Sequence, residues 1–130
     1  MPVEPKIKSF LIADMVFQEK LTNKWNVIGI FDKFYAYNFP AMMNSLDLYI
    51  RLTDAEGEYE VRVEFCDGID HKLAVFEGIK LKVKSRLQYP EFGVKTRHLP
   101  IQKPGKYFFY IYMNGKQVGS MPLLAEQIKK

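Results

Sequence analysis

The sequence is poor in cysteine, since the 130-residue chain contains only Cys66. A single cysteine excludes an intramolecular disulfide and a CxxC metal site, and it gives no sign of an oxidising compartment. The chain also lacks an apolar run long enough to span a bilayer. The run from Phe10 to Phe17 is short, is interrupted by Asp14 and is followed by no small-residue cleavage site. We therefore expect a cytoplasmic protein that does not insert into a membrane.

Helical periodicity is also scarce, because apolar residues at i, i+3 and i+4 are hard to find before the last few residues. Apolar residues recur instead at every second position, which is the period of a strand with one buried face. The clearest runs are Leu46 to Leu52 and Tyr59 to Phe65, which flank the turn residues Asp54 to Gly57. The pattern predicts that these two runs form a hairpin.

A second hairpin is predicted at the C-terminal end of the chain. The runs Tyr107 to Met113 and Gln117 to Leu124 flank Asn114-Gly115, the dipeptide best suited to a type I′ turn. Pro122 predicts that the last strand lies at an edge or carries a bulge, because proline cannot donate a ladder hydrogen bond.

Four further segments complete the predicted set of seven to nine mostly antiparallel strands. Ile7 to Phe17 and Trp25 to Tyr35 are each expected to be one strand, with Gly29 as a bulge. The segment around Gly78 alternates in two runs, Leu73 to Phe76 and Ile79 to Val83, and Val94 to Ile101 is a weaker, interrupted strand. Short strands at regular spacing, in a chain with 48% apolar and 26% charged residues, predict one all-β sandwich or barrel domain over residues 1–130.

Short motifs at both ends of the chain resemble a family of small bacterial β-sandwich proteins that is known only as a domain of unknown function. The motifs are Ile12-Ala13-Asp14, Val27 to Asp32, Phe39-Pro40, Leu99-Pro100-Ile101, Pro104 to Tyr107, Asn114-Gly115 and Met121-Pro122-Leu123. The resemblance implies a two-sheet, immunoglobulin-like β-sandwich. It implies no activity, cofactor or catalytic residue.

The densest polar cluster is the segment Cys66 to His71, which holds a thiol, two carboxylates and an imidazole. Asp and Gly next to a strand end are typical turn residues, so we interpret the segment as structural. His98 has no ligand type near it at metal spacing, and we expect a surface or edge position. The sequence therefore predicts no metal site and no cofactor.

Asp14 and Asp32 each lie inside an apolar run, where an ionised carboxylate costs free energy unless it is paired or hydrogen-bonded. If the first two strands pair, the two acids approach each other and form a general acid/base pair. The alternative, which we prefer, is that each carboxylate accepts hydrogen bonds at a strand end or bulge.

The segment Phe34 to Met43 places four aromatic rings and two methionines in a stretch that looks more like a loop than a strand. Rings with a polar edge and flexible thioethers on a loop suit a binding surface. The residues predicted to contact a ligand are Trp25, Tyr35, Tyr37 and Phe39. The alternative is that these rings close the open end of a sandwich, and Trp25 fits packing better than a sugar platform.

The formal net charge is +4, which by itself does not indicate nucleic-acid binding. The best candidate for a phosphate contact is the basic row Lys80, Lys82, Lys84 and Arg86. Glu58, Glu60 and Glu64 lie in the out-facing phase of an earlier strand and can offset that row if the two strands pair. We therefore expect no nucleic-acid partner.

Three functional hypotheses follow. The first is a non-enzymatic interaction module that binds a protein partner or itself as a homodimer through an exposed strand edge. The second is a carbohydrate-binding module that uses Trp25, Tyr35 and Tyr37 as stacking surfaces. The third is a hydrolase centred on Asp14 and Asp32, which requires a pocket that contains both carboxylates.

Overall fold

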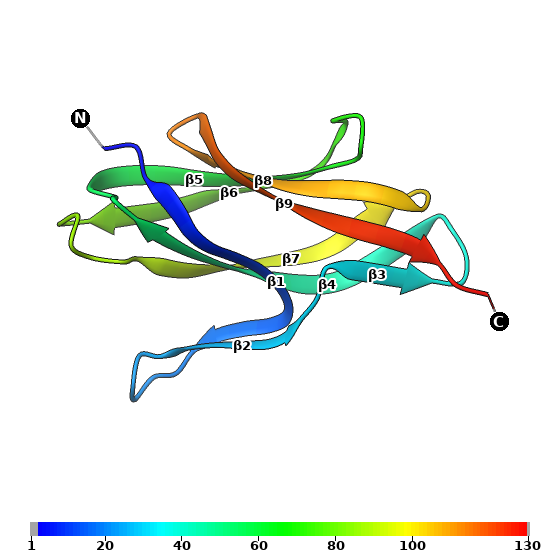
Figure 1. Ribbon diagram of the computed structural model, residues 1–130, viewed down its shortest axis with the longest axis horizontal. Coiled ribbons are helices and arrows are strands. Elements are labelled where there is room, and N and C mark those ends of the chain that lie inside the picture. Colours follow the sequence, from blue (N-terminus) through cyan, green and yellow to red (C-terminus); the bar gives the residue numbers. More distant parts are fainter. Residues whose placement is uncertain (1–2, 130) are drawn as a thin grey trace.

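The computed structural model describes residues 3–129, which form nine strands in two sheets (Figure 1). In chain order the strands are β1 (Lys6–Gln18), β2 (Trp25–Ile30), β3 (Lys33–Ala36), β4 (Ala41–Thr53), β5 (Gly57–Cys66), β6 (Lys72–Val83), β7 (Glu91–Ile101), β8 (Gly105–Met113) and β9 (Lys116–Gln127). One sheet has the order β2-β1-β4-β7 and the other the order β3-β9-β8-β5-β6. Every pairing is antiparallel except that of β3 with β9. The predicted all-β, two-sheet class is confirmed. The described residues include no helix able to cross a membrane.

The strand order is that of an immunoglobulin-like sandwich. In that fold strands A, B and E share one sheet, and strands C′, C, F and G share the other. Here β1, β4 and β7 follow the first order, and β6, β5, β8 and β9 follow the second. The hydroxyl of Tyr107, near the start of β8, donates a hydrogen bond to the carbonyl oxygen of Lys103 at 2.7 Å. This contact corresponds to the tyrosine corner of strand F, so the predicted immunoglobulin-like fold is confirmed.

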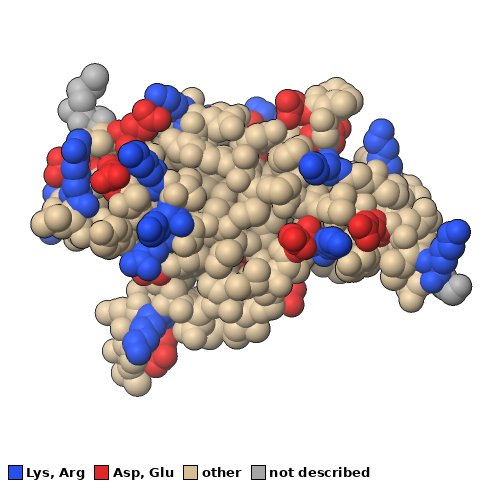
Figure 2. All heavy atoms as spheres, in the orientation of Figure 1, with Lys and Arg blue, Asp and Glu red and all other residues tan. Residues whose placement is uncertain are grey.

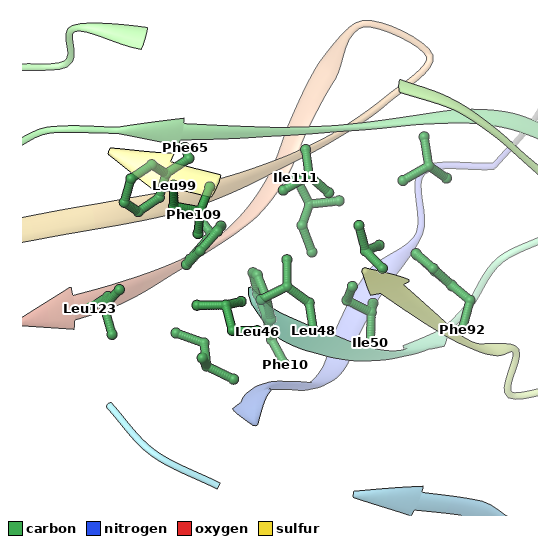
Figure 3. Close-up of a cluster of buried hydrophobic side chains, with 14 of the residues drawn as sticks. Phe10, Leu46, Leu48, Ile50, Phe65, Phe92, Leu99, Phe109, Ile111 and Leu123 are labelled. Atoms are coloured by element: carbon green, nitrogen blue, oxygen red, sulfur yellow. The ribbon is translucent and has the colours of Figure 1, made fainter. Parts of the chain in front are cut away.

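The core lies between the two sheets and is filled by side chains from both (Figure 3). The rings of Phe65 and Phe109 lie 4.8 Å apart, and Phe65 also stacks on Tyr107 at 5.5 Å. Antibody domains have a cysteine two residues after the corner tyrosine on strand F, and this chain has Phe109 at that position, packed against Phe65 of the neighbouring strand β5. Six side chains in the in-facing phase of the three clearest alternating runs are all at most 1% exposed: Leu48, Ile50, Val61, Val63, Phe109 and Ile111.

The C-terminal hairpin was predicted correctly. Strands β8 and β9 pair across Asn114 and Gly115, whose φ angles are 52° and 81°. Pro122 lies opposite Phe108, and β3 pairs with β9 only from Leu124 onward. Pro122 therefore stands on a part of β9 that has no strand on its outer side, as expected of an edge proline.

The hairpin predicted between residues 46–53 and 59–66 was wrong. Strand β4 pairs with β1 and β7, whereas β5 belongs to the other sheet and pairs with β6 and β8. The turn at Asp54 to Gly57 carries the chain from one sheet to the other. The alternating pattern located the buried face of each strand, but the two buried faces meet across the core and not along a shared ladder.

The strand predicted over Trp25 to Tyr35 divides in two. Strand β2 pairs with β1, and β3 joins the opposite sheet beside β9. Gly29 is not a bulge, since the β1–β2 register is the same on both sides of it. Glycine suits this position for two other reasons: its φ is +72°, and a Cβ there would lie 2.3 Å from the Asp14 carboxylate.

The two runs about Gly78 form one continuous strand. Strand β6 has a register shift between Val61 and Val63 of its neighbour β5, and Gly78, with φ of +85°, lies at this irregularity. The weaker strand predicted over Val94 to Ile101 begins three residues earlier, at Glu91.

Truncation of the core should be costly. Ile50→Ala and Ile111→Ala remove side chains that are fully buried from either sheet, and each should lower the free energy of unfolding by about 2–5 kcal/mol. Urea denaturation measures this value. Leu87→Ala is the control, because Leu87 is 87% exposed and its loss should change stability by less than about 0.5 kcal/mol. Similar values for the three variants would contradict the assigned core.

Candidate functional site

The β1–β2 hairpin departs from the sheet that it starts in. Strand β1 pairs with β4 as far as Ala13 and with β2 from there to Gln18. Figure 1 shows β1 turning sharply midway, so that its second half and β2 project below the rest of the molecule in that view. The buried Asp47 of β4 holds the hairpin in place. One of its carboxylate oxygens accepts the backbone N–H of Val16 at 2.8 Å and the Lys95 ammonium at 2.9 Å.

The inner face of the hairpin packs on the outer face of the four-stranded sheet. Val16, Trp25 and Val27 surround Tyr49, and the Trp25 and Tyr49 ring centroids are 6.1 Å apart. A Cβ at Gly93 would lie 3.3 Å from the Trp25 ring, so glycine allows this close approach. Trp25, predicted to bind a ligand, is thus half-buried and takes part in packing.

The outer face of the hairpin is apolar and exposed. Met15 lies opposite Ile28, and Phe17 lies opposite Asn26, so the four side chains share one face. Met15, Phe17 and Ile28 are 50%, 39% and 52% exposed. We call these three residues the apolar hairpin face. Figure 2 shows charged residues at the tip of the hairpin and a largely uncharged surface along its body.

A groove of about 410 Å³ lies where the chain passes from one sheet to the other. Asp14, Lys33, Tyr35 and Ser45 contribute its polar groups, and Ile30 is among its apolar residues. Asp32 does not line it, and both aspartates are exposed. The groove therefore brings Asp14 and Tyr35 together and does not contain the pair of carboxylates that the hydrolase hypothesis requires.

The remaining predicted ligand residues are dispersed. Tyr35 and Tyr37 are about half-exposed near the end of β3, whereas Phe39 packs against the main core. The side-chain amide of Gln127 donates to the carbonyl of Tyr37 at 2.9 Å and fixes the loop after β3 to the C-terminal strand. Of the four predicted residues, Tyr35 lines the groove beside Asp14.

The outer face of the five-stranded sheet carries an aromatic row that the sequence analysis missed. Phe108, Tyr110 and Tyr112 occupy the out-facing phase of β8, between the buried Tyr107, Phe109, Ile111 and Met113. The Phe108 and Tyr110 rings stack at 5.9 Å, and the Arg62 guanidinium lies 4.4 Å from the centroid of the Tyr112 ring. The signal was present in the sequence: from Tyr107 to Met113 both phases are apolar or aromatic, so one aromatic phase had to face outward.

The polar residues beside this row form a groove of about 370 Å³. Buried Glu64 accepts a hydrogen bond from Arg62 Nε at 2.9 Å and forms an ion pair with Lys72 at 3.2 Å. The Tyr110 hydroxyl donates to Asp70 at 2.9 Å. We call this groove, which is lined by Glu64, Cys66, Asp70, Lys72, Tyr110, Tyr112 and Gln117, the polar-aromatic groove.

Comparison with known proteins assigns the chain to a family. The model of a family of unknown function, DUF6941, matches residues 8–126. The chain belongs to DUF6941. A search of curated proteins found no match.

Solved structures resemble the DUF6941 chain in fold. The alkylpurine DNA glycosylase AlkC of Pseudomonas fluorescens, bound to DNA with an abasic site analogue, is 12% identical and has a TM-score of 0.59. The match covers 95% of this chain and 30% of that protein, so this chain spans less than a third of its length. An immunoglobulin-like protein from Pseudomonas aeruginosa is 11% identical with a TM-score of 0.47, and the match covers 95% of this chain and 98% of that one.

The Cys66 to His71 segment of the DUF6941 chain is a tight turn. Asp67 accepts the backbone N–H groups of Ile69 and His71 at 3.0 and 2.8 Å, and the His71 ring lies 3.2 Å from its carboxylate. Burial, together with the nearby Glu64, raises the pKa of the Cys66 thiol. His98 is exposed, as expected. Among residues 3–129, no group of three or more His, Cys, Asp or Glu side chains is placed to hold a metal ion.

Two residues of the basic row, Lys80 and Lys82, lie opposite glutamates as expected, whereas Lys84 and Arg86 follow the end of β6 and Glu64 lies opposite Val75. Strands β5 and β6 pair Glu58 with Lys82 and Glu60 with Lys80. The Lys82 ammonium lies 3.8 Å from the Glu58 carboxylate. Opposite charges on neighbouring strands reduce the positive potential of this edge.

The contact between Tyr110 and Asp70 predicts that the Tyr110 hydroxyl ionises at a higher pH than that of an ordinary tyrosine. The hydrogen bond to Asp70, with desolvation, raises the pKa of Tyr110 from 10.0 to about 12. Asp70→Gly removes the carboxylate without strain at φ of +62°, so the pKa of Tyr110 should fall toward its ordinary value of about 10. Spectrophotometric titration should then show one tyrosine fewer among those that ionise late. Tyr49 is the internal control, because burial and Glu91 raise its pKa to about 12.

Proposed function

We propose that this DUF6941 protein is a non-enzymatic β-sandwich module that binds protein, either a partner or a second copy, through the apolar hairpin face. The observation that carries the proposal is the exposure of Met15, Phe17 and Ile28 on one side of a projecting hairpin. Grouped apolar side chains on a surface mark interaction sites more often than singly scattered ones do. A flexible methionine among them adapts to the shape of a partner.

The sheet edges support the same surface. Strand β2 is an edge strand, and its six residues include no charge and no proline. Strand β6, an edge strand of the other sheet, differs from β2 because it carries Lys72, Lys80 and Lys82. Charged residues protect a strand edge from pairing with another chain, and β2 lacks that protection.

The polar cluster at the end of β5 supports a non-enzymatic role. Burial raises the pKa of the Cys66 thiol, which lowers the share of the thiolate, the nucleophilic form. The Asp67 carboxylate is engaged by the backbone of its own turn. The candidate nucleophile and the candidate acid therefore both have structural roles that account for them.

A carbohydrate-binding role for Trp25, Tyr35, Tyr37 and Phe39 has less support. Trp25 packs on Tyr49 and Phe39 packs on the core, so the four rings do not gather on one concave surface. We rank this set below the apolar hairpin face as a binding surface.

Self-association is the first test. Sedimentation at high micromolar concentration should show a dimer of the wild-type chain, and Ile28→Glu should shift it to monomer, because a charge placed in an apolar contact loses its hydration. Val75→Glu is the matched control, since Val75 is also partly exposed but lies on β6. It should sediment like the wild type.

A heterologous partner requires a second measurement. A photo-cross-linking residue at position 28 should form protein adducts in cells that one at position 82 does not form. The proposal would be contradicted if the chain is monomeric at high micromolar concentration and forms no adducts specific to position 28.

We further propose that the chain does not bind nucleic acid specifically, although the AlkC structure contains DNA. The pairing of Lys80 and Lys82 with Glu60 and Glu58 supports this. At 0.15 M salt the Debye length is about 8 Å, so the partly neutralised row attracts phosphates weakly. Fluorescence anisotropy with single- and double-stranded oligonucleotides should show no submicromolar binding at that salt. Tight binding that disappears when Lys80, Lys82 and Lys84 are changed to Glu would contradict this expectation.

A further inference from the structure

The polar-aromatic groove is a second surface, independent of the apolar hairpin face. It lies on the outer side of the five-stranded sheet, whereas the hairpin covers the outer side of the other sheet. Its volume of about 370 Å³ falls within the usual range for small-molecule sites. It is lined by the phenol rings of Tyr110 and Tyr112, the carboxylates of Glu64 and Asp70, the Lys72 ammonium and the Gln117 amide.

The groove has no excess of cations. Glu64 and Asp70 supply two carboxylates to its lining and Lys72 supplies one ammonium, while the Arg62 guanidinium pairs with Glu64 from beside the groove. A site for a phosphate or a polyanion needs an excess of cations, which this groove does not have. The balance favours an uncharged ligand that both accepts and donates hydrogen bonds.

Stability does not explain the charged groups. The Glu64 side chain is 8% exposed, although it lies on the outer face of a sheet. Removing a carboxylate from water costs free energy that its ion pairs only partly return, and an apolar residue of similar size often stabilises a fold as much or more. Recognition of a ligand therefore gives the buried Glu64 carboxylate, between Arg62 and Lys72, a role that stability does not.

The aromatic row is preorganised. Tyr110 is fixed by stacking on Phe108 and by its hydrogen bond to Asp70, and Tyr112 is fixed by the Arg62 guanidinium. Rings at every second residue of a strand stand about 7 Å apart. A fixed site loses little conformational entropy when it binds, so weak individual contacts can sum to useful affinity.

A protein is a poorer match for this surface. The cores of protein interfaces are depleted in Lys, Glu and Asp, and Glu64, Asp70 and Lys72 all line this groove. A sugar matches both halves of the site, because its C–H faces pack on aromatic rings while its hydroxyls exchange hydrogen bonds with carboxylate, amide and ammonium groups.

We propose that the polar-aromatic groove binds a neutral saccharide chain that runs along β8, with Tyr110 and Tyr112 against the sugar rings. Glu64 and Asp70 accept hydrogen bonds from its hydroxyls, and Lys72 and Gln117 donate to its oxygens. The site differs from the one predicted from the sequence, since it includes none of Trp25, Tyr35, Tyr37 and Phe39.

The test is calorimetric titration of the full chain with three neutral polysaccharides, laminarin, xyloglucan and hydroxyethyl cellulose, and with heparin as the polyanion. Saturable binding of at least one neutral polysaccharide is expected. Tyr110→Ala and Gln117→Ala should each weaken it by roughly tenfold. Gln117 is exposed, so its replacement tests the site even if Tyr110→Ala perturbs the sheet. Tyr35→Ala and Ile28→Glu are controls that should bind like the wild type.

Four results would overturn the proposal. They are no binding of any neutral polysaccharide, binding of heparin alone, binding that survives both groove variants, and loss of self-association in Tyr110→Ala without any sugar binding. The last result would identify a protein-binding face. Since Ile28→Glu tests the hairpin separately, failure of the saccharide site leaves the proposed protein-binding function standing, and the reverse also holds.

Discussion

The fold depends on the burial of apolar side chains between two sheets that no disulfide joins. Phe65 of β5 stacks on Tyr107 and packs against Phe109, both of the neighbouring strand β8, and the three rings contribute to the core that the two sheets share. The Tyr107 hydroxyl reaches back to Lys103 and fixes the start of β8. Since β8 lies at the centre of its sheet, between β5 and β9, this corner also determines where the out-facing side chains of β8 stand.

The outer faces of the two sheets differ in what covers them. The four-stranded sheet is covered by its own hairpin, which Asp47 holds through the backbone of Val16 and the Lys95 ammonium. That arrangement buries Tyr49 and transfers the exposed apolar surface to the far side of the hairpin. The five-stranded sheet has no such cover, and it carries rings and paired charges instead. The chemistry of the two candidate surfaces therefore follows from one topological difference.

Much of the fold could be predicted from the sequence, because period-two alternation and Asn114-Gly115 are local signals. Partner choice could not, because alternation in Leu46 to Leu52 identifies a buried face and not the strand beside it. The passage from β2 to β3 was equally hidden, since no turn dipeptide marks Phe31 and Asp32. The candidate site was predicted least well. Trp25 and Phe39 have the composition of ligand contacts but pack internally, while Tyr110 and Tyr112 stood in a strand whose other phase was already assigned to the core.

The outer face of a sheet that no other element covers can carry charged side chains, as β6 does, or can be apolar and pair with another chain. The outer face of β5 and β8 follows neither course. Its rings are held side by side, and Arg62 and Lys72 both pair with the buried Glu64 carboxylate. Such a face is neither strongly apolar nor strongly charged. It keeps hydrogen-bond donors, acceptors and apolar rings at fixed positions. The buried carboxylate of Glu64 costs free energy, and binding of the proposed saccharide, which presents both hydroxyl and C–H surface, would use the fixed positions of these groups.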